Sequence, residues 1–269
     1  SCGTPAFGVG AGNVLVIMDE HADLANAANK ILQSKTFDNA TSCSSENGVI
    51  ICQQVYDKAI TALESVGGLM LDAADKKRLQ DVMFDNGKLT SALTAQNPTV
   101  IAERAQLQNP KARSAKFFMV EEQGYGPSAP FSGEKLSPIL TVWKVADFDA
   151  AKTLVGNVYS YQGAGHSVGL HTAQAGQILE SRVASLAQQL PVARIIVNQA
   201  HAIATGGSFE NGLPFSLSMG CGTWGKNNFS DNMNYRHYLN ITRVVRPIPE
   251  HVPKVEDLLK NYFSQFPQV

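Results

Sequence analysis

Residues 35–47 read KTFDNATSCSSEN and set one cysteine, Cys43, between small hydroxyl residues. Apolar residues then recur at three- and four-residue steps, which predicts an amphipathic helix from about Asn47 to Val66. A thiol just ahead of a helix meets unpaired backbone N–H groups and the positive end of the helix dipole, and both favour the thiolate. Cys43 is therefore the candidate nucleophile.

Short apolar runs alternate with helical segments on both sides of that stretch. Runs with strand character lie at residues 14–18, 116–120, 139–145, 168–171 and 195–197. Helices are expected at 22–34, 73–84, 98–107, 148–158 and 174–190. This alternation predicts an α/β fold of three layers (α/β/α), in which helices cover both faces of a mostly parallel sheet.

Two segments depart from this alternation. Residues 205–232 lose their periodicity and are rich in Gly, Ser, Asn and Phe, and a long structureless segment inside a compact domain is often functional. From Tyr235 onward a strand-like run at 238–245 precedes a short amphipathic helix near 255–263. We expect a main domain over residues 1–234 and a C-terminal arm over 235–269, which serves oligomerisation or adds a strand between domains.

Composition and cysteine usage exclude several classes of protein. The 269 residues are 44% hydrophobic and 17% charged, with a net charge of −1, so nothing favours nucleic acid or an anionic membrane as a partner. No run of apolar residues is long enough to predict a transmembrane helix. The chain has four cysteines, Cys2, Cys43, Cys52 and Cys221, which form no C-x-x-C pair and match no zinc module. Their scattered spacing predicts that there is no metal site and that the thiols are reduced, as in a cytoplasmic protein.

Four other residues with reactive or ionisable side chains are weighed against an ordinary structural role. Cys52 falls on the apolar face of the expected helix and is interpreted as core, whereas Cys221, flanked by glycines, is the rival nucleophile. His166 lies on a glycine-rich loop, where it could act as a general base or be an ordinary loop histidine. Glu134, as a lone carboxylate, would normally be a solvated surface residue.

The glycine-rich run Gly8–Gly12 does not match a dinucleotide-binding loop. That fingerprint needs a strand before the glycines and a helix after them, whereas here the strand follows. The run instead predicts a tight turn where backbone segments approach closely.

Five strings, in order along the chain, together resemble the C-terminal catalytic half of the aldehyde dehydrogenase superfamily. They are GVGAGN (8–13), KTFDN (35–39) leading to CSSE (43–46), EKLSP (134–138), GAGH (163–166) and GCGTWG (220–225). More narrowly, they resemble the coenzyme A-acylating branch. That branch includes sulfoacetaldehyde and succinate-semialdehyde dehydrogenases that make acyl-CoA, and the aldehyde half of bifunctional aldehyde–alcohol dehydrogenases.

The resemblance implies a role for each matched residue. Cys43 would attack an aldehyde to give a thiohemiacetal, hydride would pass to NAD or NADP, and the resulting thioester would pass its acyl group to coenzyme A. Glu134 would hold the nicotinamide ribose, and His166 would bind or orient the cofactor. The substrate pocket would be lined by Ser42, Ser44, Cys221, Gly222 and Thr223.

Two departures from the family pattern bear on the reaction. Hydrolytic members carry a glutamate in a Glu-Leu-Gly-Gly string that activates water, and Gly8 stands at the corresponding place here, which favours acyl transfer to coenzyme A. Family members are also longer, and their N-terminal half supplies the nucleotide-binding domain and an asparagine that stabilises the oxyanion. With that domain absent, we expect a fragment that turns over little or nothing alone, cut from a homodimer or homotetramer.

Three alternatives stay open at this point. The first is a hydrolytic aldehyde dehydrogenase. The second is a cysteine hydrolase that uses Cys43 with His166 or His201, which would need a third group to orient the histidine. The third is an inactive fragment that acts only as an oligomerisation module through the tail from Tyr235. The best substrate candidate is a small aldehyde such as sulfoacetaldehyde, succinate semialdehyde or acetaldehyde.

Overall fold

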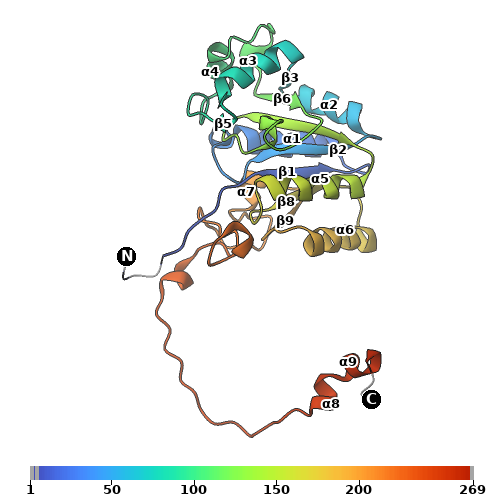
Figure 1. Cartoon of the computed structure of the whole chain (residues 1–269), viewed down its shortest axis with the longest axis vertical. Coiled ribbons are helices and arrows are strands. Elements are labelled where there is room, and N and C mark those ends of the chain that lie inside the picture. The colour runs from blue at the N-terminus through green and yellow to red at the C-terminus, as the bar shows by residue number, and fades with distance from the viewer. Residues whose placement is uncertain (1–2, 4–5, 267–269) are drawn as a thin grey trace. The chain divides into compact units, whose positions relative to one another are not determined.

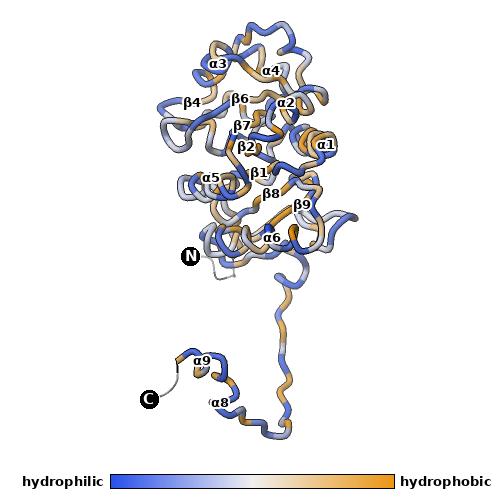
Figure 2. Tube along the Cα trace, turned by 90° about the vertical axis from the view of Figure 1, so that its right-hand side faces the viewer, coloured by the Kyte–Doolittle hydropathy of each residue, from blue (hydrophilic) through white to orange (hydrophobic). Residues whose placement is uncertain are grey.

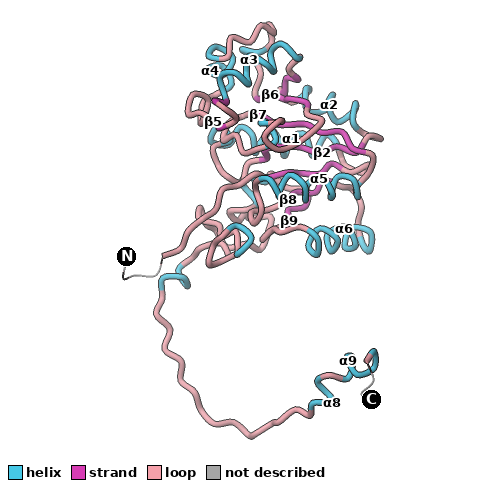
Figure 3. The backbone as a smooth tube through the Cα atoms, viewed as in Figure 1, coloured by secondary structure: helices cyan, strands magenta, loops and turns pink. Residues whose placement is uncertain are grey.

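The computed structural model describes Gly3 and residues 6–266 of the chain. Contacts between residues divide the chain into two units, Ser1–Asn234 and Tyr235–Val269. Figure 1 labels the helices and strands, and Figure 3 colours the same backbone by secondary structure. Cys2 lies outside the described residues.

A seven-stranded sheet forms the centre of the first unit, in the order β3-β6-β7-β2-β1-β8-β9. Every neighbouring pair in this sheet is parallel, as the expected fold class requires. The strands are β1 (Val14–Met18), β2 (Glu46–Cys52), β3 (Gly68–Met70), β6 (Phe117–Glu121), β7 (Ile139–Val145), β8 (Val168–His171) and β9 (Ile195–Val197). A separate antiparallel pair joins β4 (Phe84–Asp85) to β5 (Lys88–Leu89).

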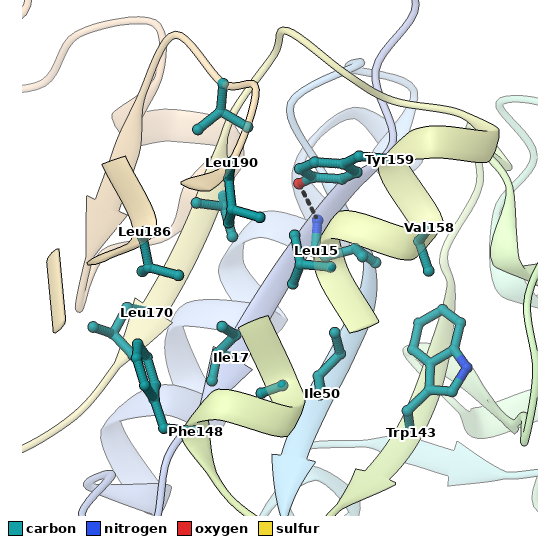
Figure 4. Close-up of a cluster of buried hydrophobic side chains, with 14 residues drawn as sticks. Leu15, Ile17, Ile50, Trp143, Phe148, Val158, Tyr159, Leu170, Leu186 and Leu190 are labelled. Carbon is teal, nitrogen blue, oxygen red and sulfur yellow. Dashed lines mark hydrogen bonds between the residues drawn. The ribbon is translucent and has the colours of Figure 1, made fainter. Parts of the chain in front are cut away.

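Helices cover both faces of the sheet, because alternate residues of each central strand point to opposite sides. On one face, Val16 and Ile51 pack against α1 (Leu24–Thr36) and α2 (Tyr56–Ser65). On the other face, Leu15, Ile17 and Ile50 pack against α5 (Phe148–Tyr161) and α6 (Gly176–Gln189), as Figure 4 shows. The three-layer α/β/α arrangement is therefore confirmed.

A third apolar cluster lies beside β3 and β6. It brings together α3 (Ala73–Met83), α4 (Pro98–Arg104) and strand residues such as Phe118 and Val120. The short helix α7 (His201–Ala204) follows β9 and precedes the aperiodic segment 205–232. Within that segment the structure has one 3₁₀ turn, Thr223–Gly225, and an isolated antiparallel bridge between Met219 and Asn232, and otherwise loops and turns.

The helix expected from Asn47 to Val66 is wrong. The chain forms β2 over Glu46–Cys52 and turns at residues 53–55, and only then does α2 begin. Residues 49–51 are Val-Ile-Ile, a β-branched run that is fully buried between β1 and β7, which is the environment of a central parallel strand. The interpretation of Cys52 as a core residue is confirmed, because its side chain is fully buried at the end of β2.

The second unit contains little regular structure. The strand expected at 238–245 is wrong: Tyr235–Tyr238 is a 3₁₀ turn, and residues 239–254 have no regular secondary structure. A strand needs a neighbouring strand for its backbone N–H and C=O groups, and among the described residues no strand or β-bridge is formed with residues 239–254. The expected terminal helix appears as two short helices, α8 (Val255–Leu258) and α9 (Lys260–Gln265). Hydrophobic and hydrophilic residues alternate along the unit, as Figure 2 shows. Many of its apolar side chains are exposed, among them Val245 and Ile248.

Candidate active site

Cys43 lies in a turn that leads directly into β2. The N–H of Ser45 donates to the carbonyl of Ser42 at 3.0 Å, which closes the turn around the thiol. Upstream, Asp38, Asn39 and Ala40 adopt φ values of 49°, 49° and 54°, a left-handed conformation that side-chain-bearing residues rarely adopt. This left-handed turn ends α1 and redirects the chain toward the edge of the sheet.

The helix-dipole argument for a Cys43 thiolate is wrong, because a strand follows the thiol instead of a helix. Burial, followed by the negative charge of Glu134, raises the pKa of Cys43 to about 11. The guanidinium of Arg194 acts in the opposite direction. At neutral pH the sulfur is therefore protonated, and a nucleophilic role requires a neighbour that stabilises the thiolate.

The side chain in contact with the sulfur is that of His166. Its Nε2 lies 3.4 Å from the Sγ of Cys43, although the two residues are far apart in the sequence. The side chain is almost fully buried, and burial lowers the pKa of His166 to about 4, with Arg194 as a second cause. The imidazole is consequently neutral near pH 7, with one protonated and one unprotonated ring nitrogen.

Two further groups extend this pair. The Nδ1 of His166 lies 2.6 Å from the Oγ of Ser167, and the same Oγ lies 2.7 Å from the Nε2 of His201. Four polar groups thus form one hydrogen-bonded chain that begins at the sulfur. Sequence reasoning had considered His201 only as an alternative partner of Cys43 and had not considered Ser167.

Glu134 is not a solvated surface carboxylate. Its Oε1 accepts the backbone N–H of Gly12 at 3.1 Å, and burial raises the pKa of Glu134 to about 7. A Cβ at Gly12 would lie 2.1 Å from the carbonyl oxygen of Cys43, so the glycine lets Glu134 and the cysteine turn approach the same backbone. The close backbone approach predicted for Gly8–Gly12 is confirmed at Gly12, but the tight turn predicted there is wrong, because residues 6–13 form no turn. Glu134 also lines a cavity of ≈ 410 Å³.

Cys221 is fully buried, so its flanking glycines do not expose it as a rival nucleophile. A Cβ at Gly165 would lie 2.5 Å from the carbonyl oxygen of Cys221, which places the 220–225 turn directly beside the loop of His166. Gly222 is buried with a left-handed φ of 64°, and Thr223 is exposed at the first position of the 3₁₀ turn.

The serines beside Cys43 face different surroundings. The Oγ of Ser42 lies 2.7 Å from that of Ser44, and Ser44 is buried, with its hydroxyl near the carbonyl of Ala202. Ser42 is half-buried and lines a cavity of ≈ 530 Å³. Most of the other residues that line this cavity are apolar, among them Phe37, Ile203, Phe215, Leu217 and Met219.

Arg194 is a residue that sequence reasoning missed. It is almost completely buried, and its guanidinium donates to the carbonyls of Gly220 and Ser230 and to the Oδ1 of Asn232. These bonds attach the aperiodic segment to the start of β9. The positive charge of Arg194 also lowers the pKa of both Cys43 and His166.

The groups around Cys43 share one topological feature: each precedes a strand of the sheet. Because the strands are parallel, residues that precede them meet at the same edge. Gly12 precedes β1, Cys43 precedes β2, Glu134 precedes β7, His166 precedes β8 and Arg194 precedes β9. That shared position is the signal from which Ser167 and Arg194 could have been found.

Within Gly3 and residues 6–266, no group of three or more His, Cys, Asp or Glu side chains is placed to hold a metal ion. In the same part of the chain, the three cysteines Cys43, Cys52 and Cys221 are free. None of the described helices is both long and apolar enough to span a bilayer.

Comparisons with known proteins identify relatives over nearly the whole chain, although no family model matches it. The chain is 56% identical over 265 residues to the sulfoacetaldehyde dehydrogenase (acylating) of Cupriavidus necator, which covers 98% of this chain and 53% of the relative. It is 34% identical to the succinate-semialdehyde dehydrogenase (acetylating) of Clostridium kluyveri, over 91% of this chain and 52% of that protein. The chain thus spans about half the length of these curated relatives.

A solved structure agrees with the sequence comparisons. The acetylating aldehyde dehydrogenase from Geobacillus thermoglucosidasius superposes with a TM-score of 0.84 and 34% identity, covering 94% of this chain and 54% of that one. The parallel sheet, the strings around Cys43 and these relatives agree. Over nearly its whole length, the chain is therefore homologous to about half the length of these acylating aldehyde dehydrogenases.

Proposed function

We propose that this chain carries the reacting cysteine of a coenzyme A-acylating aldehyde dehydrogenase, working as part of a longer enzyme. The observation that carries the proposal is the 3.4 Å contact between the Sγ of Cys43 and the Nε2 of His166 at the shared edge of the parallel strands. The similarity to an acylating sulfoacetaldehyde dehydrogenase over nearly the whole chain supports it.

In the proposed reaction, the Cys43 thiolate attacks the aldehyde carbon, and a C–S bond forms while the carbonyl electrons move to oxygen. NAD or NADP, when bound, supplies the acceptor for the hydride that leaves this carbon, and a thioester remains on Cys43. The thiol of coenzyme A then attacks the thioester carbon and displaces Cys43 as a thiolate. Because burial raises the pKa of Cys43 to about 11, the hydrogen-bond contact with His166 is needed to stabilise that thiolate.

Glu134 suits a hydroxyl-bearing cofactor. One carboxylate oxygen is held by Gly12 while the side chain lines the ≈ 410 Å³ cavity, so the carboxylate can accept hydrogen bonds from ribose hydroxyls. We assign His166 to the reacting sulfur rather than to the cofactor, because its Nε2 faces Sγ. The choice between NAD and NADP is not assigned to any of these residues.

The pocket assignment is also part of the proposal. We assign Ser42 and the 220–225 turn, with Thr223, to the wall around a small aldehyde, because Gly165 packs that turn beside His166. Ser44, Cys221 and Gly222 are buried and would support this wall from behind. Sulfoacetaldehyde is the preferred substrate, since the 56% identical relative is a sulfoacetaldehyde dehydrogenase (acylating). Residues 235–269 are proposed as an arm for contacts between subunits or domains.

One observation favours a second candidate. Ser167 provides the third group behind the Cys43–His166 pair that a cysteine hydrolase would need. The relatives favour the dehydrogenase. The resemblance of residues 8–13 to the family pattern, which implies Gly8 in place of the glutamate of hydrolytic members, supports the same choice. Thioester transfer to a thiol, rather than to water, separates the two candidates.

The test uses the reverse acyl transfer in the longer enzyme, which needs no nicotinamide. Incubation with an acyl-CoA should move the acyl group to sulfur and release free coenzyme A, giving a mass increase on the peptide that contains Cys43. Cys43→Ala should abolish the adduct, whereas the matched control Cys52→Ala, in the core at the end of β2, should keep it. An adduct that persists in Cys43→Ala, or rapid hydrolysis of acyl-CoA without an adduct, would refute the proposal.

A further inference from the structure

The hydrogen-bonded chain behind Cys43 is closed off from solvent. His166, Ser167 and His201 are all at most 1% exposed, and their polar atoms are 2.6 and 2.7 Å apart. The Oγ of Ser167 is the shared atom, with one imidazole on each side. Since distances this short require a proton between each pair, the single hydroxyl must serve both rings.

A serine hydroxyl has one proton, so it donates to one ring and accepts from the other. In the first arrangement Ser167 donates to the Nδ1 of His166 and accepts from the Nε2 of His201. His166 then carries its proton on Nε2, facing Cys43. In the second arrangement all these bonds are reversed, and His166 presents an unprotonated Nε2 to the sulfur.

His201 decides between the two arrangements. Its Nδ1 is buried and has no hydrogen-bond partner among the described residues, and it lies against Gly169, where a Cβ would come within 3.0 Å of it. The first arrangement leaves this atom as a bare acceptor, whereas the second leaves it as a buried N–H without an acceptor. Orphaned buried N–H groups are the rarer case in folded proteins, so the first arrangement is favoured.

Hydrogen bonds to the backbone fix the segment that contains Ser167. The Tyr159 hydroxyl accepts the N–H of Leu15 at 3.3 Å, as Figure 4 shows, and donates to the carbonyl of Ser167 at 2.6 Å. On the other side of His166, the N–H of Gly165 donates to Pro191 and its carbonyl accepts from Ala193. The segment is therefore attached to β1 and to the chain that enters β9.

We propose that Ser167 and His201 are positioning residues that hold His166 as the Nε2–H tautomer, so that it donates a hydrogen bond to the Cys43 sulfur. His166 is then the group that stabilises the thiolate, and it is not the base that removes the thiol proton. When the S–H bond breaks, the electron pair stays on sulfur and the proton passes to buffer, because Cys43 is only half-buried. This inference rests on the proposed function, which makes Cys43 the reacting sulfur.

The first test reads the tautomer directly, by ¹⁵N NMR of histidine ring nitrogens in the unmodified protein at neutral pH. Signals of His166 are assigned as those lost in His166→Gln. We expect a protonated Nε2 and an unprotonated, hydrogen-bonded Nδ1. A protonated Nδ1 would overturn the proposal, whatever the variants do.

The second test measures alkylation of Cys43 by iodoacetamide at one fixed pH, with the modified peptide quantified by mass spectrometry. Loss of a hydrogen bond of ordinary strength predicts that Ser167→Ala slows alkylation by about threefold to tenfold. The matched control Ser160→Ala, an exposed serine on α5 whose hydroxyl donates to the carbonyl of Gly156, should have no effect.

The deciding comparison is the double variant. If Ser167 acts through His166, then Ser167→Ala should have no further effect on alkylation in a His166→Ala protein. An equal slowing in both backgrounds would mean that Ser167 only supports the structure, and would refute the inference. The proposed function fails separately: in that case acyl transfer to Cys43 is absent while the His166 tautomer is still as expected.

Discussion

Replacing Lys35 by methionine should remove the group that joins the start of β2 to the start of β7. The Nζ of Lys35 donates to the carbonyls of Glu46 at 2.9 Å, Ser137 at 2.9 Å and Ile139 at 3.1 Å. Three acceptors require three N–H bonds, which only the ammonium form has, so these bonds oppose the burial that lowers the pKa of Lys35 to about 7. Methionine fills a similar volume but donates nothing, so three carbonyls lose their donor.

The expected loss of folding stability follows from the burial of the Lys35 ammonium. Lys35 is 1% exposed and Glu46 is 0% exposed, so the variant also leaves a buried carboxylate without its positive neighbour. Leaving a buried charge without its compensating neighbour costs about 3–5 kcal/mol, against a total stability of about 5–15 kcal/mol for a typical domain. Adding a separate value for each hydrogen bond would count the same ammonium more than once.

The loss of stability in Lys35→Met should grow as the pH rises. Burial raises the pKa of Glu46 above its value in the unfolded chain, and removing Lys35 raises it further. A carboxyl whose pKa is raised on folding binds more protons in the folded state, so stability falls as pH rises from the unfolded pKa through the folded pKa. Lys35→Met should therefore be most destabilised, relative to the unmodified chain, above neutral pH.

The assay is urea unfolding followed by circular dichroism and by the fluorescence of Trp143, which is 2% exposed. The matched control is Lys77→Met, whose exposed ammonium pairs with Asp81 on the surface of α3 and should change stability by less than about 0.5 kcal/mol. A Lys35→Met protein within about 1 kcal/mol of the unmodified chain, with an unchanged urea slope, would refute the reasoning.

The remaining predictions concern the thiol and its neighbours. Alkylation of Cys43 should rise about tenfold per pH unit from about pH 7 to about pH 10, because its pKa is raised to about 11; a plateau near neutral pH would contradict this. Glu134→Gln should speed alkylation at a fixed pH, since removal of a negative charge lowers the thiol pKa, and Arg194→Met should slow it. Gly12→Ala should cost about 1–3 kcal/mol in urea unfolding, because its Cβ would lie 2.1 Å from the carbonyl oxygen of Cys43.

Much of the fold could be predicted because its apolar runs are short and bounded by clear helical segments. The β1, β7, β8 and β9 strands lie where their apolar runs indicated. The error at β2 arose because Val49, Cys52, Val55 and Ala59 also fit a helical spacing, and periodicity alone cannot separate a short buried strand that is followed closely by a helix. In the structure the first part of this stretch is a strand, since β2 lies between β1 and β7 in the sheet.

The sequence was enough to select the residues of the candidate site, but not their contacts or the pKa of the thiol. Cys43 and His166 were found as a cysteine among serines and a histidine among glycines, and the structure places them 3.4 Å apart. Their contact depends on β1 lying between β2 and β8, an order that local sequence does not encode. The raised thiol pKa could not be predicted either, because it follows from burial by segments distant in the sequence.

The side chain of Asn232 has a consequence for how this pocket can vary. Its Oδ1 accepts from Arg194, and its Nδ2 donates to the carbonyls of Thr205 and Pro214, so the two ends of the 205–232 segment are fastened to each other and to β9. Lengthening a loop whose ends are already joined costs little chain entropy, about 0.6 kcal/mol for each doubling of its length. Insertions within residues 208–218, which are exposed or half-buried, are therefore thermodynamically cheap. The 220–225 turn, packed against the loop of His166, is not open to such changes.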